Sequence, residues 1–86
     1  MRSNNTTVIQ KYIARSKRSL NWYAVQLGYS LKDGHSSFNL IAKGERVPHA
    51  RKRRELSIIF GVNVGDLWEF DQATGAIIAK RVEEEK

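Results

Sequence analysis

The chain has 86 residues, a formal net charge of +6 at neutral pH and no cysteine. This length favours one domain with a modest core, and the absence of thiols excludes disulfide bridges and thiolate metal sites. No apolar run is long enough for a membrane span or a signal peptide, so we expect a cytoplasmic protein without a membrane partner.

The positive charge is concentrated in the first two thirds of the chain. Residues 1–54 hold twelve Lys and Arg against two acids, whereas residues 55–79 hold four acids and no Lys or Arg. A basic surface of this kind favours a polyanionic partner, of which nucleic acid is the commonest. The alternative is a solvated charged face that serves solubility alone.

Two amphipathic helices are predicted in the first third of the chain. The first begins at Thr6 or Thr7, and its buried stripe consists of Val8, Ile9, Tyr12 and Ile13. The second runs from Ser19, as N-cap, to Leu27 and ends at Gly28. Ala24 in its middle is small enough for another helix to cross closely. Asn21 lies where backbone amides and the helix dipole favour a phosphate oxygen, so it is a candidate DNA contact.

A third helix is predicted from about His35 or Ser36 to Lys43, after a connection with a turn signal at Asp33-Gly34. Phe38 and Ile41 face inward, and Gly44 ends the helix. Lys32 in the connection is a candidate phosphate contact. The polar and cationic side chains that can reach base edges and phosphates are His35, Ser36, Ser37, Asn39 and Lys43.

Asn39 is the best base-reading candidate of this helix, because an exposed asparagine can form a paired hydrogen bond with adenine. Serine serves several bases, so Ser36 and Ser37 are candidates as well. Helix capping is an equally good explanation for Ser36. His35 is a weaker candidate that faces solvent.

A fourth helix is predicted after Gly44, with Pro48 in its first turn and four cations at residues 51–54. Because four consecutive residues spread around a helix, only one or two can bind the same ligand. Arg51 together with Arg46 is the pair that we expect to bind the DNA backbone. Further along, Leu56, Ile59 and Phe60 face the core.

A fifth, core-closing helix is predicted over residues 63–70. We assign residues 1–71 to the helical domain and residues 72–86 to a C-terminal strand or arm. The apolar Ile77, Ile78 and Val82 of this arm suggest burial against a second copy of the chain, and a frayed end is the alternative.

The glycines at 28, 44 and 61, Phe38 with Ile41, Arg46 with Pro48, and Asp66-Leu67 resemble, in order and largely in spacing, the Cro and phage-repressor type helix-turn-helix family. The most specific part is GERVP followed by ELSIIFGVNVGDLW, and the resemblance covers about residues 7–70. It implies an all-α bundle of about five helices, similar to lambda repressor, that binds operators as a dimer.

The resemblance also implies roles for particular residues. The recognition helix would be about His35 to Lys43, with Ser36, Ser37 and Asn39 reading bases in the major groove. The segments from Ser19 to Asn21 and from Gly44 to Arg46 would bind phosphates.

The sequence therefore predicts a sequence-specific double-stranded DNA-binding transcriptional regulator of phage or plasmid type, most simply a homodimeric repressor. We expect no cofactor, no metal and no small-molecule substrate. Catalysis is disfavoured because the two histidines lack metal spacing and no phosphate loop or nucleophile motif is present. The alternative is a protein-interaction module, such as an antitoxin or phage accessory factor, that uses Trp22, Trp68 and the arm and binds DNA weakly.

Overall fold

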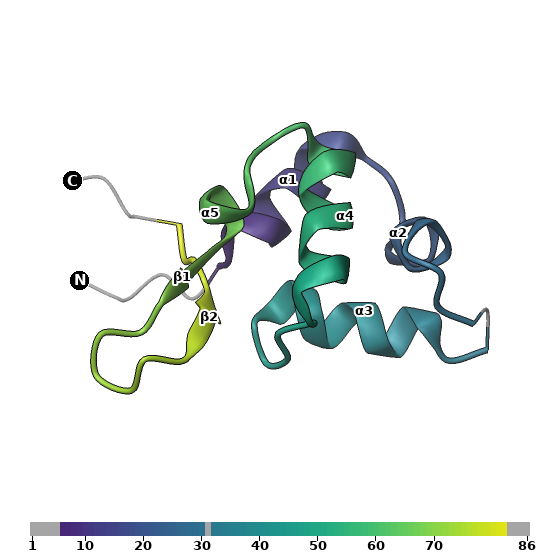
Figure 1. Cartoon of the computed structure of the whole chain (residues 1–86). Coiled ribbons are helices and arrows are strands. Elements are labelled where there is room, and N and C mark those ends of the chain that lie inside the picture. Colours follow the sequence, from purple (N-terminus) through teal and green to yellow (C-terminus); the bar gives the residue numbers. More distant parts are fainter. Residues whose placement is uncertain (1–5, 31, 83–86) are drawn as a thin grey trace.

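Five helices followed by a two-stranded antiparallel sheet make up the computed structural model, which describes residues 6–30 and 32–82 (Figure 1). The elements are α1 (Val8–Ser16), α2 (Leu20–Gln26), α3 (Gly34–Lys43), α4 (Ala50–Phe60), α5 (Val64–Leu67), β1 (Trp68–Phe70) and β2 (Ile77–Ala79). The predicted set of about five short helices is confirmed, and the predicted C-terminal strand is present as β2. The fold is mostly helical, and a small two-stranded sheet is added to the helices.

The first two helices begin at the predicted caps. Thr7 Oγ1 accepts a hydrogen bond from the Gln10 N–H at 3.1 Å, and Gln10 Oε1 accepts one from the Thr7 N–H at 3.0 Å. The two residues thus form a capping box. Ser19 Oγ accepts a hydrogen bond from the Trp22 N–H at 3.0 Å and starts α2.

Aromatic rings from four helices fill the core. Tyr23 of α2 stacks on Phe38 of α3, with ring centroids 5.3 Å apart, and tilts against Phe60 of α4 at 5.4 Å. Tyr12 of α1 stacks on Phe60 at 5.2 Å. The inward positions predicted for Phe38 and Ile41 are confirmed, since both side chains are fully buried. These contacts hold α3 rigidly against the other helices.

The C-terminal end of α3 is held by the start of α1 and by the segment after β2. The Thr7 hydroxyl donates to the carbonyl oxygen of Ala42, and Arg81 Nη1 donates to that of Lys43 at 3.4 Å. Gly44, which ends α3 as predicted, has a φ of 85°. A β-carbon there would lie 3.2 Å from Thr7 Cγ2, so a side chain would fit only if its neighbours shifted.

The predicted boundaries of α3 and α4 need small corrections. α3 begins at Gly34, just ahead of the predicted start, and α4 begins at Ala50 with His49 as its N-cap. Pro48 therefore lies before α4 and not in its first turn. It is buried, and its carbonyl oxygen accepts a hydrogen bond from Arg53 Nη1 at 2.6 Å.

The helix predicted over residues 63–70 is wrong in its second half. Asp66 Oδ2 accepts a hydrogen bond from the Asn63 N–H at 3.0 Å and supports a helix start, but α5 has four residues. From Trp68 onward the chain is extended and pairs with β2. Aromatic residues favour a strand once a partner strand is available, and that partner lies beyond the window in which helical periodicity is visible.

The C-terminal segment folds back on its own chain. In the hairpin, Trp68 pairs with Ala79 and Phe70 with Ile77, so residues assigned to an arm pair with residues of the preceding segment. Ala79 is 3% exposed and Ile77 packs against the core, which excludes a frayed end for this strand. Residues 83–86 of the predicted arm lie outside the described residues. In the described part of the chain, no helix has both the length and the apolar character to cross a membrane.

Candidate nucleic-acid interface

Three polar side chains form a row along α3 on the side opposite the core. Ser36, Asn39 and Lys43 are three and four residues apart, a spacing that places them on one face of a helix. The buried residues of α3 occupy the other face; they are Gly34, Phe38, Ile41 and Ala42. With a rise of 1.5 Å per residue, the row extends over about 10 Å. Ser36 and Lys43 are exposed, and Asn39 is half-buried. We call these three residues the outward row.

The polar groups of this helix are available to an external partner. His35 is exposed on one flank of the outward row, and Ser37 is half-buried on the other. Within residues 6–30 and 32–82, the side chains of His35, Ser37 and Asn39 form no hydrogen bond. Lys43 forms one exposed ion pair with Glu45 at 3.8 Å, and such surface pairs are weak.

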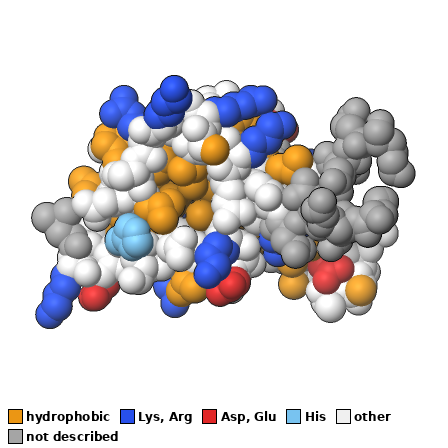
Figure 2. Space-filling model, turned by 180° about the vertical axis from the view of Figure 1, so that it is seen from behind, with side chains coloured by type: hydrophobic (Ala, Val, Ile, Leu, Met, Phe, Trp, Pro, Cys, Tyr) orange, Lys and Arg blue, Asp and Glu red, His pale blue; other side chains and the backbone are white. Residues whose placement is uncertain are grey.

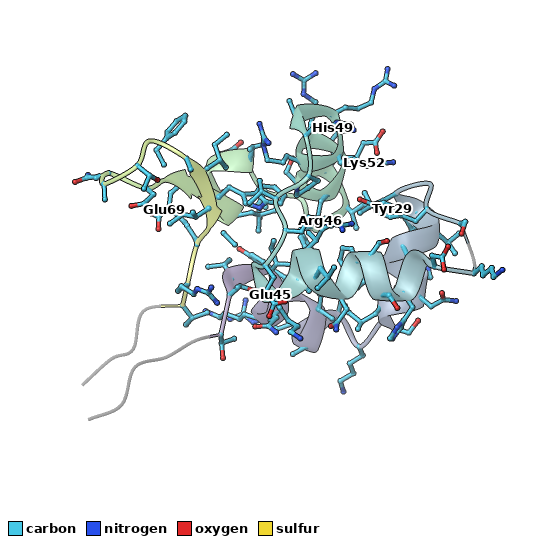
Figure 3. All side chains as sticks on the ribbon, turned by 90° about the horizontal axis from the view of Figure 1, so that it is seen from below. Tyr29, Glu45, Arg46, His49, Lys52 and Glu69 are labelled. Carbon is cyan, nitrogen blue, oxygen red and sulfur yellow. The ribbon has the colours of Figure 1, made fainter. Side chains whose placement is uncertain are left out.

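Basic residues lie along one flank of α3. Figure 3 looks onto this helix and shows Arg46 beside it, with Lys52 and His49 further out on the same side and Glu45 at the C-terminal end. Arg46 and the neighbouring Arg51 are exposed. Lys and Arg side chains are also unevenly distributed over the rear face of the molecule. Figure 2 shows them gathered along the upper edge of this face, whereas the centre of the face is apolar.

The remaining candidate contacts lie before α3. Lys32 is exposed in the connection between α2 and α3. Asn21 is exposed in the first turn of α2 and has no side-chain hydrogen bond to another described residue, whereas the Ser19 hydroxyl oxygen is engaged as the N-cap. Next to them, the Arg18 guanidinium lies 4.4 Å from the centroid of the Trp22 ring. The start of α2 therefore presents an amide and a stacked cation to solvent.

The cations at residues 51–54 point in different directions, as expected for consecutive helical residues. Arg51 and Arg54 are exposed, whereas Lys52 and Arg53 are half-buried. Arg53 is hydrogen-bonded to Pro48, as described above. Arg51 thus remains available for a phosphate contact.

Lys52 has a structural role that the sequence did not reveal. Its ammonium group donates a hydrogen bond to the carbonyl oxygen of Leu27, at the end of α2, where the helix dipole favours a cation. The same group lies 5.0 Å from the centroid of the Tyr29 ring and 4.0 Å from Glu55 Oε1. Lys52 therefore joins α4 to the connection that leads into α3. A run of four cations gives no signal that one of them binds a carbonyl 25 residues earlier.

Tyr29 lies beside Lys52 and is a neutral group. Burial raises the pKa of its phenol above the ordinary value of 10.0, while the positive charge of Arg46 lowers it and the negative charge of Glu55 raises it. Since burial is the largest of these effects, Tyr29 keeps its proton at neutral pH. Its ring and hydroxyl lie beside Arg46 and Lys52. Because the phenol is neutral, it adds no negative charge to this side of α3.

The fold defines a small, mostly helical domain in which α2 and α3 pack against each other. Within the described residues, no group of three or more His, Asp or Glu side chains is arranged to bind a metal ion. Comparisons of the chain with protein-family models, with curated proteins and with solved structures find no match. The function must therefore be inferred from the geometry of α3 and of the cations around it.

Proposed function

We propose that the protein is a sequence-specific double-stranded DNA-binding regulator of transcription, most simply a repressor. The observation that carries this proposal is the outward row of α3, whose polar groups face solvent from a helix fixed by an aromatic core. The major groove of DNA is about 12 Å wide and admits an α-helix with its side chains. A rigid helix with unengaged short polar side chains suits this groove.

The outward row would supply the base contacts. The Asn39 amide carries a donor and an acceptor that match the adenine edge, and the Ser36 hydroxyl can donate or accept. Lys43 would bind a guanine edge or a phosphate. On the flanks of the row, Ser37 and His35 would add contacts. Each good paired contact would contribute roughly 1–3 kcal/mol of discrimination between bases.

The surrounding cations would supply most of the affinity. Arg46 and Arg51 would bind phosphates on one side of α3, and Lys32 would bind one near the start of α3. The first turn of α2, with Ser19 and Asn21, would contribute backbone and amide donors to a further phosphate. Each phosphate that is neutralised makes the slope of log K against log salt more negative by about 0.9.

The protein would act on DNA as a homodimer. A two-fold symmetric pair of recognition helices reads two half-sites about one helical turn apart, which multiplies the specificity of each helix. Within the described residues α3 is the one candidate for such a helix, so pairing of two chains would supply the second.

Selection of bound sites from a pool of random duplexes tests this function. The full chain would be incubated with the pool at two salt concentrations, and the retained duplexes would be sequenced. We expect a two-fold symmetric motif that persists at the higher salt concentration. Equal retention of all duplexes would contradict base reading and would favour the alternative of a protein-interaction module that binds DNA weakly.

A further inference from the structure

A pocket with aromatic walls lies between the end of α1, the start of α2 and the end of α4. It has a volume of about 340 Å³, and its lining includes Tyr12, Arg15, Arg18, Trp22, Ile59 and Phe60. None of the described residues that line it belongs to α3 or to the hairpin. Figure 1 shows α4 rising from α3, so the last residues of α4 lie far from α3. We call this feature the aromatic pocket.

Contacts between rings fix the shape of the aromatic pocket. Tyr12 and Phe60 stack with their ring centroids 5.2 Å apart, and the rings of Trp22 and Tyr23 meet edge to face at 4.9 Å. Tyr23 is 1% exposed, whereas Tyr12, Trp22 and Phe60 are half-buried. Part of each half-buried ring therefore stays open to solvent. An open apolar surface that is rimmed by polar residues favours burial by a partner.

The two guanidinium groups at the aromatic pocket have no counter-charge in the described part of the chain. Arg15 and Arg18 are exposed, and neither side chain forms an ion pair or a hydrogen bond with another described residue. No Asp or Glu is among the described residues that line the pocket. The dipole of α1 favours Arg15 in its last turn, but Arg18 precedes the N-cap of α2, where the dipole disfavours a cation. A bound anion would offset both charges.

Arg18 is held in a position that suits a carboxylate. Its guanidinium carbon lies over the Trp22 ring, 4.4 Å from the ring centroid. This contact leaves the N–H donors of the guanidinium available to oxygen acceptors. Two of these donors match the two oxygens of a carboxylate, and a guanidinium that already rests on a ring loses little freedom when it binds one. A carboxylate bound here would lie beside the apolar surface of the pocket.

The combination of charge and apolar surface favours a protein segment over a DNA duplex. The phosphate backbone of a duplex could satisfy the guanidinium groups, but its bases are stacked inside and it offers no apolar group to the rings beside them. An acidic peptide supplies a carboxylate and an apolar side chain next to each other. Because Arg15 and Arg18 at the rim are exposed, the pocket does not enclose a free small molecule on most sides, as small-molecule sites do.

We propose that the aromatic pocket binds an acidic segment of another protein. An aromatic or large aliphatic side chain of this segment lies against Trp22, Ile59 and Phe60, and neighbouring carboxylates bind Arg15 and Arg18. The site goes beyond the proposed function, since it requires no DNA. The outward row stays uncovered when the pocket is occupied, because no described residue of α3 lines the pocket.

Selection from a phage library of random linear peptides on the immobilised full chain tests this site. We expect enrichment of peptides in which an aromatic or large aliphatic residue stands beside Asp or Glu. One enriched peptide, labelled with fluorescein, is then titrated with the chain and followed by fluorescence anisotropy. Replacing its apolar residue by serine, or its acidic residues by their amides, should each raise the dissociation constant by about tenfold. No enrichment, or enrichment of peptides without acidic residues, would overturn the proposal.

Charge reversal at the pocket separates a specific contact from general attraction. Arg18→Glu should raise the dissociation constant of the labelled peptide by about tenfold or more, because it replaces attraction by repulsion. Arg54→Glu is the matched control, since Arg54 is exposed on α4, does not line the pocket and undergoes the same change of charge. Circular dichroism checks that both variants fold, and Arg18→Gln with Arg54→Gln gives the same comparison if charge reversal unfolds the chain. Equal effects at the two positions would overturn the site.

Competition distinguishes the peptide from other occupants. Complete displacement of the labelled peptide by duplex or single-stranded DNA would assign the pocket to nucleic acid, and self-association of the chain that Arg18→Glu abolishes would assign it to a second copy; either result overturns the proposal. The pocket and the DNA function can also fail separately. A chain that selects a DNA motif but enriches no peptide keeps the proposed function, whereas a chain that binds acidic peptides through Arg18 and retains all duplexes equally keeps the pocket alone.

Discussion

Gly34 at the start of α3 lies against Ala24 of α2 so closely that a β-carbon on Gly34 would be 3.0 Å from the β-carbon of Ala24. The same atom would lie 3.1 Å from the β-carbon of Tyr29. This contact sets how near the two helices approach, and it confirms that Ala24 allows a close crossing.

The substitution Gly34→Ala should therefore destabilise the fold. Overpacking of a tight contact costs roughly 1–3 kcal/mol, and the better helix propensity of alanine recovers at most about 1 kcal/mol. We expect a net loss of about 1–2 kcal/mol in the free energy of unfolding, measured by urea denaturation. Gly65→Ala in α5 is the matched control, because a β-carbon there meets no atom within 4 Å. Equal stability of the two variants would show that the α2–α3 contact can relax without cost.

Lys52→Met removes the ammonium group that joins α4 to the end of α2 while keeping an unbranched apolar side chain. Hydrogen bonds to charged groups contribute about 1.5–3 kcal/mol, and the partial exposure of Lys52 reduces this value. We expect a loss of about 1–2 kcal/mol in the free energy of unfolding, measured by urea denaturation. Arg54→Met, on an exposed neighbour in the same helix, should change stability by less than about 0.5 kcal/mol. A Lys52 variant as stable as this control would mean that the Leu27 carbonyl is equally well satisfied by water.

Local signals in the sequence were sufficient to place the first four helices. Thr7 and Ser19 are capping residues, Gly44 and Gly61 favour the left-handed conformation that ends a helix, and each stripe of apolar residues has helical spacing. These signals act over three or four residues, so a single sequence contains them in full. The fully buried Phe38 of α3 was predicted on the same basis.

Contacts between residues distant in the chain were not predictable in this way. The strand at Trp68 forms because Ala79 pairs with it, and the position of Lys52 depends on the Leu27 carbonyl across the fold. Neither interaction produces a periodic pattern of apolar residues in the sequence. The same limit applies to the candidate site: the sequence led us to expect Arg51, which is exposed, as the phosphate contact among the four cations, but it did not reveal that Lys52 is bonded internally.

Asn39→Ala should relax the sequence preference of DNA binding without changing the fold. Asn39 is half-buried and forms no side-chain hydrogen bond within the described part of the chain, so its removal leaves no unsatisfied protein group. We expect the affinity for the selected site to fall by about 1–3 kcal/mol and that for unrelated duplexes to change little, as measured by fluorescence anisotropy. Asn21→Ala provides the contrast, because loss of a phosphate contact should weaken binding to every duplex about equally. An unchanged ratio of the two affinities in Asn39→Ala would remove this residue from base reading.

Arg51→Ala should lower the salt dependence of binding to all duplexes. Arg51 is exposed near the start of α4, beside α3, and an arginine there that neutralises one phosphate contributes about 0.9 to the magnitude of the slope of log K against log salt. We therefore expect the slope to become less negative by about 0.9, with the same loss for the selected site and for unrelated duplexes. Arg15→Ala, on an exposed arginine in the last turn of α1, controls for the general effect of net charge, because it removes the same charge outside α3 and α4. If both variants shift the slope equally, Arg51 acts through the overall field of the protein and makes no direct contact with a phosphate.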